Sequence, residues 1–166
     1  WSNSIIEHNF IANIKSTGTT DPICPNMHAE GVATLGLNEN ITFRYNLWDK
    51  VGGTAVFAGI NEGESRYWKI YGNIFSRSST TIYYYDAATN HQEMNYLQFY
   101  NNTIVNIPGV SMGTININTG TNNVAYNNIW YNNIANSFVF TNVTHDYNFY
   151  YNNRRTEGFD PPQNKD

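Results

Sequence analysis

The sequence Ile41-Thr42-Phe43-Arg44-Tyr45-Asn46-Leu47-Trp48 decides the fold, because imperfect copies of it recur along the chain. Each copy alternates apolar and polar residues over a few positions, then has an Asn, and then has further apolar residues. The related stretches are 6–11, 68–75, 97–104, 124–130 and 146–150. The aligned residues are Asn9, Asn46, Asn73, Asn102, Asn128 and Asn148, which lie 20 to 37 residues apart. Such a spacing is typical of a solenoid or another stacked array.

A second group of strand-like segments lies between these copies. The segments are 30–35, 54–59, 81–86, 113–117 and 137–141. They are rich in Ile, Val, Tyr and Phe and are bounded by Asn, Gly and Thr, as short strands between turns usually are. Two or more short strands in every repeat indicate an all-β solenoid.

The repeated strand-Asn-apolar units resemble the right-handed parallel β-helix family, the pectate-lyase-like solenoids. The resemblance covers residues 1–153, predicts about six coils, and leaves 154–166 as a polar C-terminal tail or linker. It implies that the aligned Asn residues lie at tight turns and stack as an Asn ladder. Independently of the family, Asn tolerates left-handed backbone and hydrogen-bonds turns, and stacked amides bond along an axis.

Composition limits the classes of partner. Charged residues make up 13% of the chain, aromatic residues make up 16%, and 28 residues are Asn. The formal net charge of −4 argues against a nucleic-acid partner, which would need a basic face. No apolar run is long enough to span a bilayer, so no membrane partner is expected. The β-helix resemblance implies a secreted or cell-surface protein.

The ends of the chain suggest a piece of a longer polypeptide. The chain starts at Trp1 without a Met, and the repeat has already begun at Ile6. Exposed ends of a solenoid can pair with other strands, so the oligomeric state stays open.

His28 and Glu30 are the first candidates for chemistry. Residues two apart in a strand face the same side, so an imidazole and a carboxylate would stand together there. Such a pair can transfer protons or supply two metal ligands. The alternative is a His–Glu hydrogen bond that braces the preceding loop.

Arg44 begins a predicted outward-facing surface. In its strand we expect Ile41, Phe43 and Tyr45 to point inward, which leaves Thr42 and Arg44 outside. The Asn alignment adds further outward residues from other repeats. The predicted substrate-binding strip therefore comprises Glu7, Arg44, Lys69, Tyr71, Gln98 and Tyr100. Aromatic rings can stack on sugars and an Arg can hold a uronate carboxylate; the alternative is an ordinary solvated face.

Acidic residues in predicted loops could supply oxygen ligands for calcium, which is the one cofactor that the sequence offers as an alternative. These are Asp49 beside Lys50, and Glu62 and Glu64 beside Arg66. Because no EF-hand or nonapeptide calcium pattern is present, a calcium site is only an alternative to solvated charges. His8, His91 and His145 have no convincing partner nearby and are expected in surface or turn positions.

The resulting hypothesis is a polysaccharide lyase-like protein that acts on an acidic polysaccharide. In β-elimination Arg44 would neutralise the uronate, and His28 with Glu30 would transfer protons. A glycoside hydrolase using Glu30 with Glu7 or Asp49 is a variant. The catalytic motifs of pectate lyases and polygalacturonases are missing, however, and residues 96–153 contain few charges. The rival hypothesis is a non-catalytic carbohydrate-binding or structural β-helix, such as part of an adhesin or a fibre. An ice-binding solenoid is a weaker third, since the Thr residues are scattered.

Overall fold

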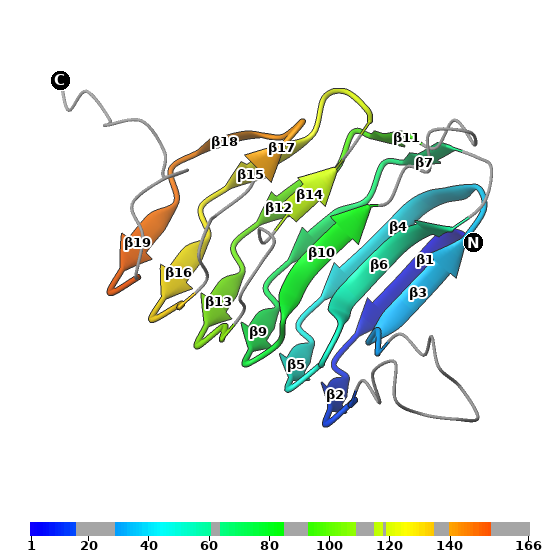
Figure 1. The fold of residues 1–166 in the computed structure, drawn as a ribbon. Helices are drawn as coiled ribbons and strands as arrows, with labels where there is room; N and C mark the ends of the chain where they lie inside the picture. Colours follow the sequence, from blue (N-terminus) through cyan, green and yellow to red (C-terminus); the bar gives the residue numbers. More distant parts are fainter. Residues whose placement is uncertain are drawn as a thin grey trace, which may run out of the picture.

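The computed structural model describes residues 1–15, 29–60, 64–84, 93–108, 115–117, 119–134 and 140–153. Within these ranges the chain forms nineteen short strands and no helix. The strands belong to three sheets, in which every neighbouring pair runs parallel. The structure is therefore all-β and compatible with a parallel β-helix (Figure 1).

We call the three sheets A, B and C. Sheet A contains β1 (Ser2–Glu7), β4 (Asn38–Arg44), β7 (Glu64–Arg66), β8 (Lys69–Tyr71), β11 (Glu93–Asn95), β12 (Gln98–Tyr100), β15 (Val124–Tyr126) and β18 (Thr144–Asp146). Sheet B contains β2 (Phe10–Ala12), β5 (Leu47–Asp49), β9 (Ile74–Ser76), β13 (Thr103–Val105), β16 (Ile129–Tyr131) and β19 (Phe149–Tyr151). Sheet C contains β3 (Val32–Leu35), β6 (Thr54–Ile60), β10 (Thr80–Tyr84), β14 (Ile115–Ile117) and β17 (Phe140–Thr141).

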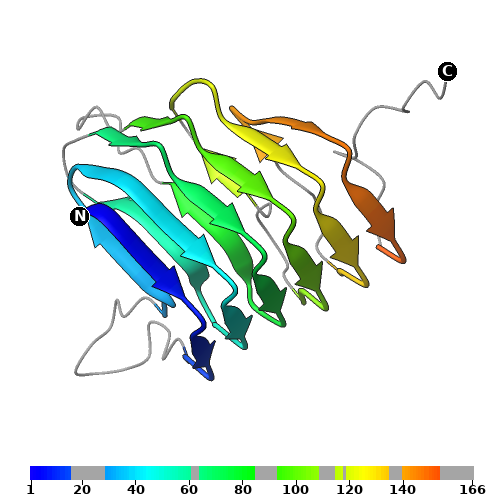
Figure 2. The same ribbon diagram turned by 180° about the vertical axis from the view of Figure 1, so that it is seen from behind.

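The chain visits the three sheets in a repeating order. It passes from sheet A through β4 to sheet B through β5 and to sheet C through β6, and the next round follows β8, β9 and β10. Each strand pairs with its counterpart in the preceding and following rounds, so sequence repeats become spatial neighbours. Figure 1 shows the rounds side by side from the N-terminal end to the C-terminal end, and Figure 2 shows sheet A from the other side, with β1 in dark blue in front.

Left-handed residues make the corners between strands. In the A-to-B corner the residue with positive φ is His8, Tyr45, Gly72, Asn101, Asn127 or Tyr147 in successive rounds. Each of these residues immediately precedes an aligned Asn. The left-handed residue at each corner is therefore the one before the ladder Asn. The ladder Asn itself does not have positive φ, and it contributes to the corner through the hydrogen bonds of its side chain.

The predicted Asn ladder is present. From Asn46 onward, the side-chain Oδ1 of each ladder Asn accepts hydrogen bonds from the backbone N–H and the Nδ2 of the Asn in the preceding round. The Nδ2–Oδ1 distances are 3.0 Å for Asn9–Asn46, 3.0 Å for Asn46–Asn73, 3.1 Å for Asn73–Asn102, 3.1 Å for Asn102–Asn128 and 2.8 Å for Asn128–Asn148. A shorter second ladder at the next corner joins Asn133 to Asn153, with Nδ2–Oδ1 at 3.0 Å. These amides satisfy corner backbone groups that would otherwise be buried without partners.

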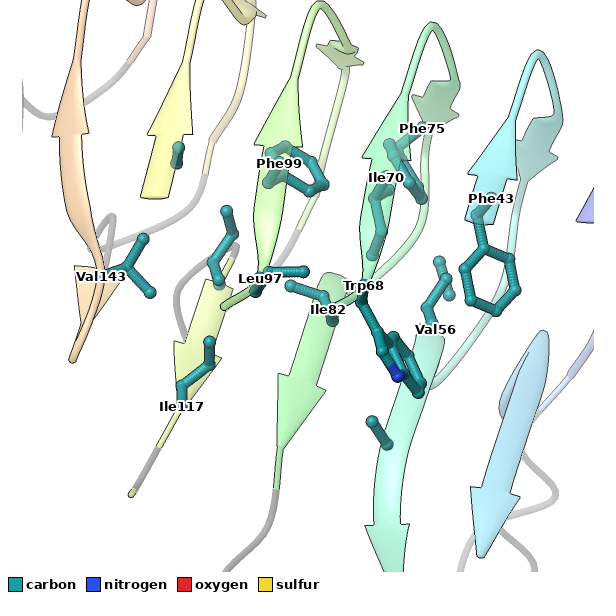
Figure 3. Packing of buried hydrophobic residues seen from close by; sticks show 14 of the residues in the cluster. Phe43, Val56, Trp68, Ile70, Phe75, Ile82, Leu97, Phe99, Ile117 and Val143 are labelled. Atoms are coloured by element: carbon teal, nitrogen blue, oxygen red, sulfur yellow. The ribbon is translucent and has the colours of Figure 1, made fainter. Parts of the chain in front are cut away.

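The core lies between the three sheets and is built from stacked apolar layers. Its largest fully buried side chains include Trp48, Trp68, Trp130, Phe43, Phe75 and Phe99. Figure 3 shows Phe43, Ile70 and Phe99, from successive strands of sheet A, pointing into the interior. Ile41 and Phe43 point inward as predicted. Tyr45 does not, because it occupies a left-handed corner and its side chain is 51% exposed.

Candidate functional site

The outer face of sheet A brings together the residues predicted to line a strip. Glu7 is in register with Arg44, Arg44 with Tyr71, and Tyr71 with Tyr100. Lys69 and Gln98 are in register in the neighbouring outward column. The alignment on the ladder Asn therefore placed all six residues on adjacent strands. Their role in binding a substrate stays a prediction.

The structure extends this strip by two residues that the sequence analysis missed. Tyr126 is in register with Tyr100, and Asp146 is in register with Tyr126. A signal existed, because both lie two residues before a ladder Asn, as Tyr100 does. We define the outward strip as Glu7, Arg44, Tyr71, Tyr100, Tyr126 and Asp146, with Lys69 and Gln98 beside it. Six strands spaced about 4.8 Å apart make it about 24 Å long.

The tyrosines of the strip stack on one another. The ring centroids of Tyr71 and Tyr100 are 4.9 Å apart at an interplanar angle of 13°, and those of Tyr100 and Tyr126 are 5.2 Å apart at 3°. Because these spacings match the strand separation, the ring faces point along the sheet toward one another. Solvent therefore meets ring edges and phenol hydroxyls. A sugar ring cannot lie on the face of Tyr100, so stacking of the kind that the sequence suggested is excluded at that residue.

Arg44 is held by two partners within the strip. Its Nε donates to Oε2 of Glu7 at 2.6 Å, and its Nη1 donates to the Tyr71 hydroxyl at 3.1 Å. The Arg44 guanidinium, through its hydrogen bond, holds the pKa of Glu7 below its ordinary value, and Glu7 and Tyr71 raise the pKa of Arg44. Both side chains are about one-third exposed, so the pair lies in reach of solvent. The strip thus contains an internally neutralised cation.

Tyr100 lies at the centre of the tyrosine stack and is half-buried. Desolvation raises the pKa of its hydroxyl, with smaller contributions from Tyr71 and Tyr126 on the two sides. A phenol whose pKa is raised stays protonated at neutral pH and can donate a hydrogen bond. The chemistry that this supports is hydrogen bonding, not removal of a proton from a substrate.

Glu30 is not part of the strip. It lies between Ala29, whose carbonyl accepts a hydrogen bond from Gly53, and Gly31, whose N–H donates to Thr54. Thr54 begins β6 in sheet C, whereas Arg44 ends β4 in sheet A, and β5 of sheet B separates the two along the chain. His28, its predicted partner, lies outside the described residues.

The charges considered for calcium have other partners. Asp49 is the last residue of β5 instead of a loop residue, and it accepts hydrogen bonds from Arg77 Nε at 2.8 Å and Nη2 at 2.5 Å. These bonds lower the pKa of Asp49. Glu64 lies beside Arg66 and accepts a hydrogen bond from Asn95. Glu62 and His91 lie outside the described residues. In the part of the chain that the structure describes, no group of three or more His, Cys, Asp or Glu side chains is placed to hold a metal ion.

Two of the histidines expected in surface or turn positions lie in the described part of the chain, and their degree of burial differs. His8 is an exposed corner residue whose ring stacks on Tyr45 with centroids 5.4 Å apart. His145 lies in β18 and is half-buried against Phe140, with ring centroids 4.3 Å apart. The expectation holds for His8 and was wrong for His145. His145 pairs in register with Ala125, a core residue, which explains its inward position.

Comparison of the chain with protein-family models, curated proteins and solved structures finds no match. No relative therefore supports a pectate-lyase-like assignment, and the three parallel sheets are compatible with a parallel β-helix in general. Among the described residues no helix is long and apolar enough to cross a membrane.

Proposed function

We propose that the chain is a right-handed parallel β-helix of about six coils that recognises a linear polysaccharide along sheet A without cleaving it. The protein would be secreted or displayed on a cell surface, where such polymers occur. The observation that carries the proposal is the in-register row from Glu7 to Asp146. It presents hydrogen-bonding groups on six adjacent strands of one outer face.

The chemistry of the row suits a hydroxyl-rich polymer. Phenol hydroxyls both donate and accept hydrogen bonds, and Lys69 and Gln98 add exposed donors and an acceptor beside them. Tyr71, Tyr100 and Tyr126 lie in register on three successive strands, so one chain of sugars can meet a phenol hydroxyl at each of them. Each contact is weak, so affinity would come from the number of contacts along the polymer.

The placement of Glu30 favours recognition over the lyase hypothesis. A lyase needs the proton-transferring groups next to the cation that neutralises the uronate. Arg44 belongs to the sheet A strip, whereas Glu30 lies at the junction leading into sheet C. Arg44 is also already paired with Glu7.

A purely structural role is the second candidate, and one observation favours it. Several ion pairs connect neighbouring rounds: Arg44 pairs with Glu7, Arg66 with Glu39, and Arg77 with Asp49. A scaffold needs such bracing and no ligand.

Binding to a panel of soluble polysaccharides, measured by affinity electrophoresis, separates these candidates. We expect the wild-type protein to be retarded by at least one polymer. Replacing Tyr100 and Tyr126 together by Phe should weaken that binding roughly tenfold, because two hydroxyls are lost without loss of stacking. The matched control replaces Tyr131 and Tyr151 by Phe. These two rings stack on each other on sheet B, with centroids 5.8 Å apart, and their replacement should leave binding unchanged.

The same incubations are assayed for new unsaturated sugar ends by ultraviolet absorbance. Their appearance would contradict the non-catalytic proposal and restore the lyase hypothesis. Absence of binding to every polymer would leave the structural role.

A further inference from the structure

The outer face of sheet A carries more acidic than basic side chains. Its described cations are Arg44, Arg66 and Lys69, whereas its described acids are Glu7, Glu39, Glu64, Glu93 and Asp146. Arg66 is engaged by Glu39 with Nε–Oε1 at 3.3 Å, and its Nη1 lies 3.7 Å from Glu64 Oε2. An anionic polymer would therefore meet a face whose arginines are already paired with acids of the protein. The protein as a whole has a net charge of −4, which also disfavours an anionic polymer.

Glu7 occupies the position that a uronate carboxylate would take on Arg44. A guanidinium binds a carboxylate best through two parallel N–H groups. A guanidinium offers two such pairs of N–H groups, one that includes Nε and one that includes Nη1. Glu7 accepts from Nε and Tyr71 accepts from Nη1, so one member of each pair is already engaged. A uronate must then displace a carboxylate that the protein itself holds 2.6 Å away.

The ion pair persists at neutral pH. The hydrogen bond from Arg44 keeps the pKa of Glu7 below its ordinary value, so the carboxylate stays ionised where a uronate is also ionised. The register between β1 and β4 places Glu7 opposite Arg44, so the competing carboxylate is a fixed feature of the paired strands.

We propose that Glu7 is a specificity-determining residue of the outward strip: by engaging Arg44 it makes the strip select neutral polysaccharides and reject acidic ones. This inference rests on the proposed function of the strip. It also reverses the expectation, drawn from the sequence, of an acidic substrate. Glu7 acts here as a built-in substitute for the acidic group of the polymer.

The experiment compares each polymer in a charged and an uncharged form at neutral pH. The free acid is ionised there, whereas the methyl ester is neutral and differs from it by one methyl group on each esterified uronate. Polygalacturonate, alginate and hyaluronate are each tested as the free acid and as the methyl ester, by affinity electrophoresis and by calorimetry. We expect the wild-type protein to bind at least one ester about tenfold more tightly than its free acid. In Glu7→Gln, which keeps the side-chain shape and removes its charge, binding of that free acid should rise about tenfold while ester binding stays within about twofold.

Two further variants test whether the effect belongs to the Arg44 pair. Glu39→Gln removes the same charge from the same face but leaves Glu7 on Arg44, so the preference for the ester should persist. Adding Arg44→Gln to Glu7→Gln should abolish the gain for the free acid. Circular dichroism confirms that each variant is folded.

The outcomes separate this inference from the proposed function. If the wild-type protein binds acid and ester equally, or if Glu7→Gln and Glu39→Gln shift the preference equally, the role of Glu7 is wrong while polysaccharide recognition stands. If no polymer in either form binds the wild type or any variant, both proposals fall. If only Glu7→Gln binds the free acids, the role of Glu7 is supported.

Discussion

At the scale of single residues, buried amides hold the corners of this fold. Asn73 is fully buried, and its Oδ1 accepts from both the backbone N–H and the Nδ2 of Asn46. Its Nδ2 donates to the Phe43 carbonyl at 2.9 Å and to Asn102. One side chain thus satisfies groups in two other rounds. A buried polar group that loses its partner costs about 1–3 kcal/mol, so such positions tolerate substitution poorly.

We expect Asn73→Ala to lower the free energy of unfolding by about 2–5 kcal/mol, because the Asn46 N–H and the Phe43 carbonyl both lose a partner in the interior. Denaturant titration followed by tryptophan fluorescence measures the change. Asn9→Ala is the matched control: Asn9 is exposed at the first round, and its Oδ1 accepts no hydrogen bond from the described residues. It should cost less than about 1 kcal/mol. An equal decrease in the free energy of unfolding for the two variants would show that position in the ladder does not matter.

At the scale of elements, strands of only two or three residues depend on neighbours in adjacent rounds. An isolated pair of such strands would be marginal in water, and here every strand gains its partners from a different round. The rounds must therefore approach closely at the connections. Gly120 lies at one such approach: its φ is +137°, and an added Cβ would overlap the carbonyl of Met94 in the preceding round. That carbonyl also accepts a hydrogen bond from Asn123.

We expect Gly120→Ala to destabilise the protein by about 2–5 kcal/mol, from left-handed strain together with displacement of a neighbouring backbone. Thermal unfolding followed by circular dichroism reports the loss. Gly36→Ala separates the two causes, since Gly36 also has positive φ, at +72°, but has open space where a Cβ would be. It should cost only about 1–2 kcal/mol. A result in which Gly36→Ala costs as much would mean that strain alone explains both.

At the scale of the whole molecule, each round contacts only its neighbours, so stability should vary along the stack. The middle rounds contain fully buried residues such as Ile70, Phe75 and Phe99, whereas the partly buried layers include Ile6 and Tyr150 in the first and last rounds. The terminal rounds have a neighbour on one side only among the described strands.

Hydrogen exchange followed by mass spectrometry should reveal this gradient. We expect the slowest amide exchange in β8, β9, β12 and β13, and the fastest in β2, β18 and β19, because opening an end round breaks one interface instead of two. Protection that is uniform from β2 to β19 would indicate that the stack opens as a single cooperative unit.

Much of this arrangement could be predicted because a stacked fold makes spatial neighbours of aligned repeats. The ladder Asn residues and the columns containing Arg44 and Lys69 followed from that alignment alone. Tyr45 was misplaced because strict alternation assumes a straight strand, and the left-handed corner interrupts it. Asp49 was assigned to a loop because its partner, Arg77, lies in another round.

The sequence by itself determined the all-β class, the repeat and which residues share a column, since these depend on local period and spacing. Only the tertiary structure decided what the columns do. It showed that the faces of Tyr71, Tyr100 and Tyr126 cover one another, that Glu7 engages Arg44, and that Glu30 lies apart from both. The physical reason is that ring orientation, ion pairing and the separation of sheets depend on contacts between rounds, and an alignment of residues carries no information about those contacts.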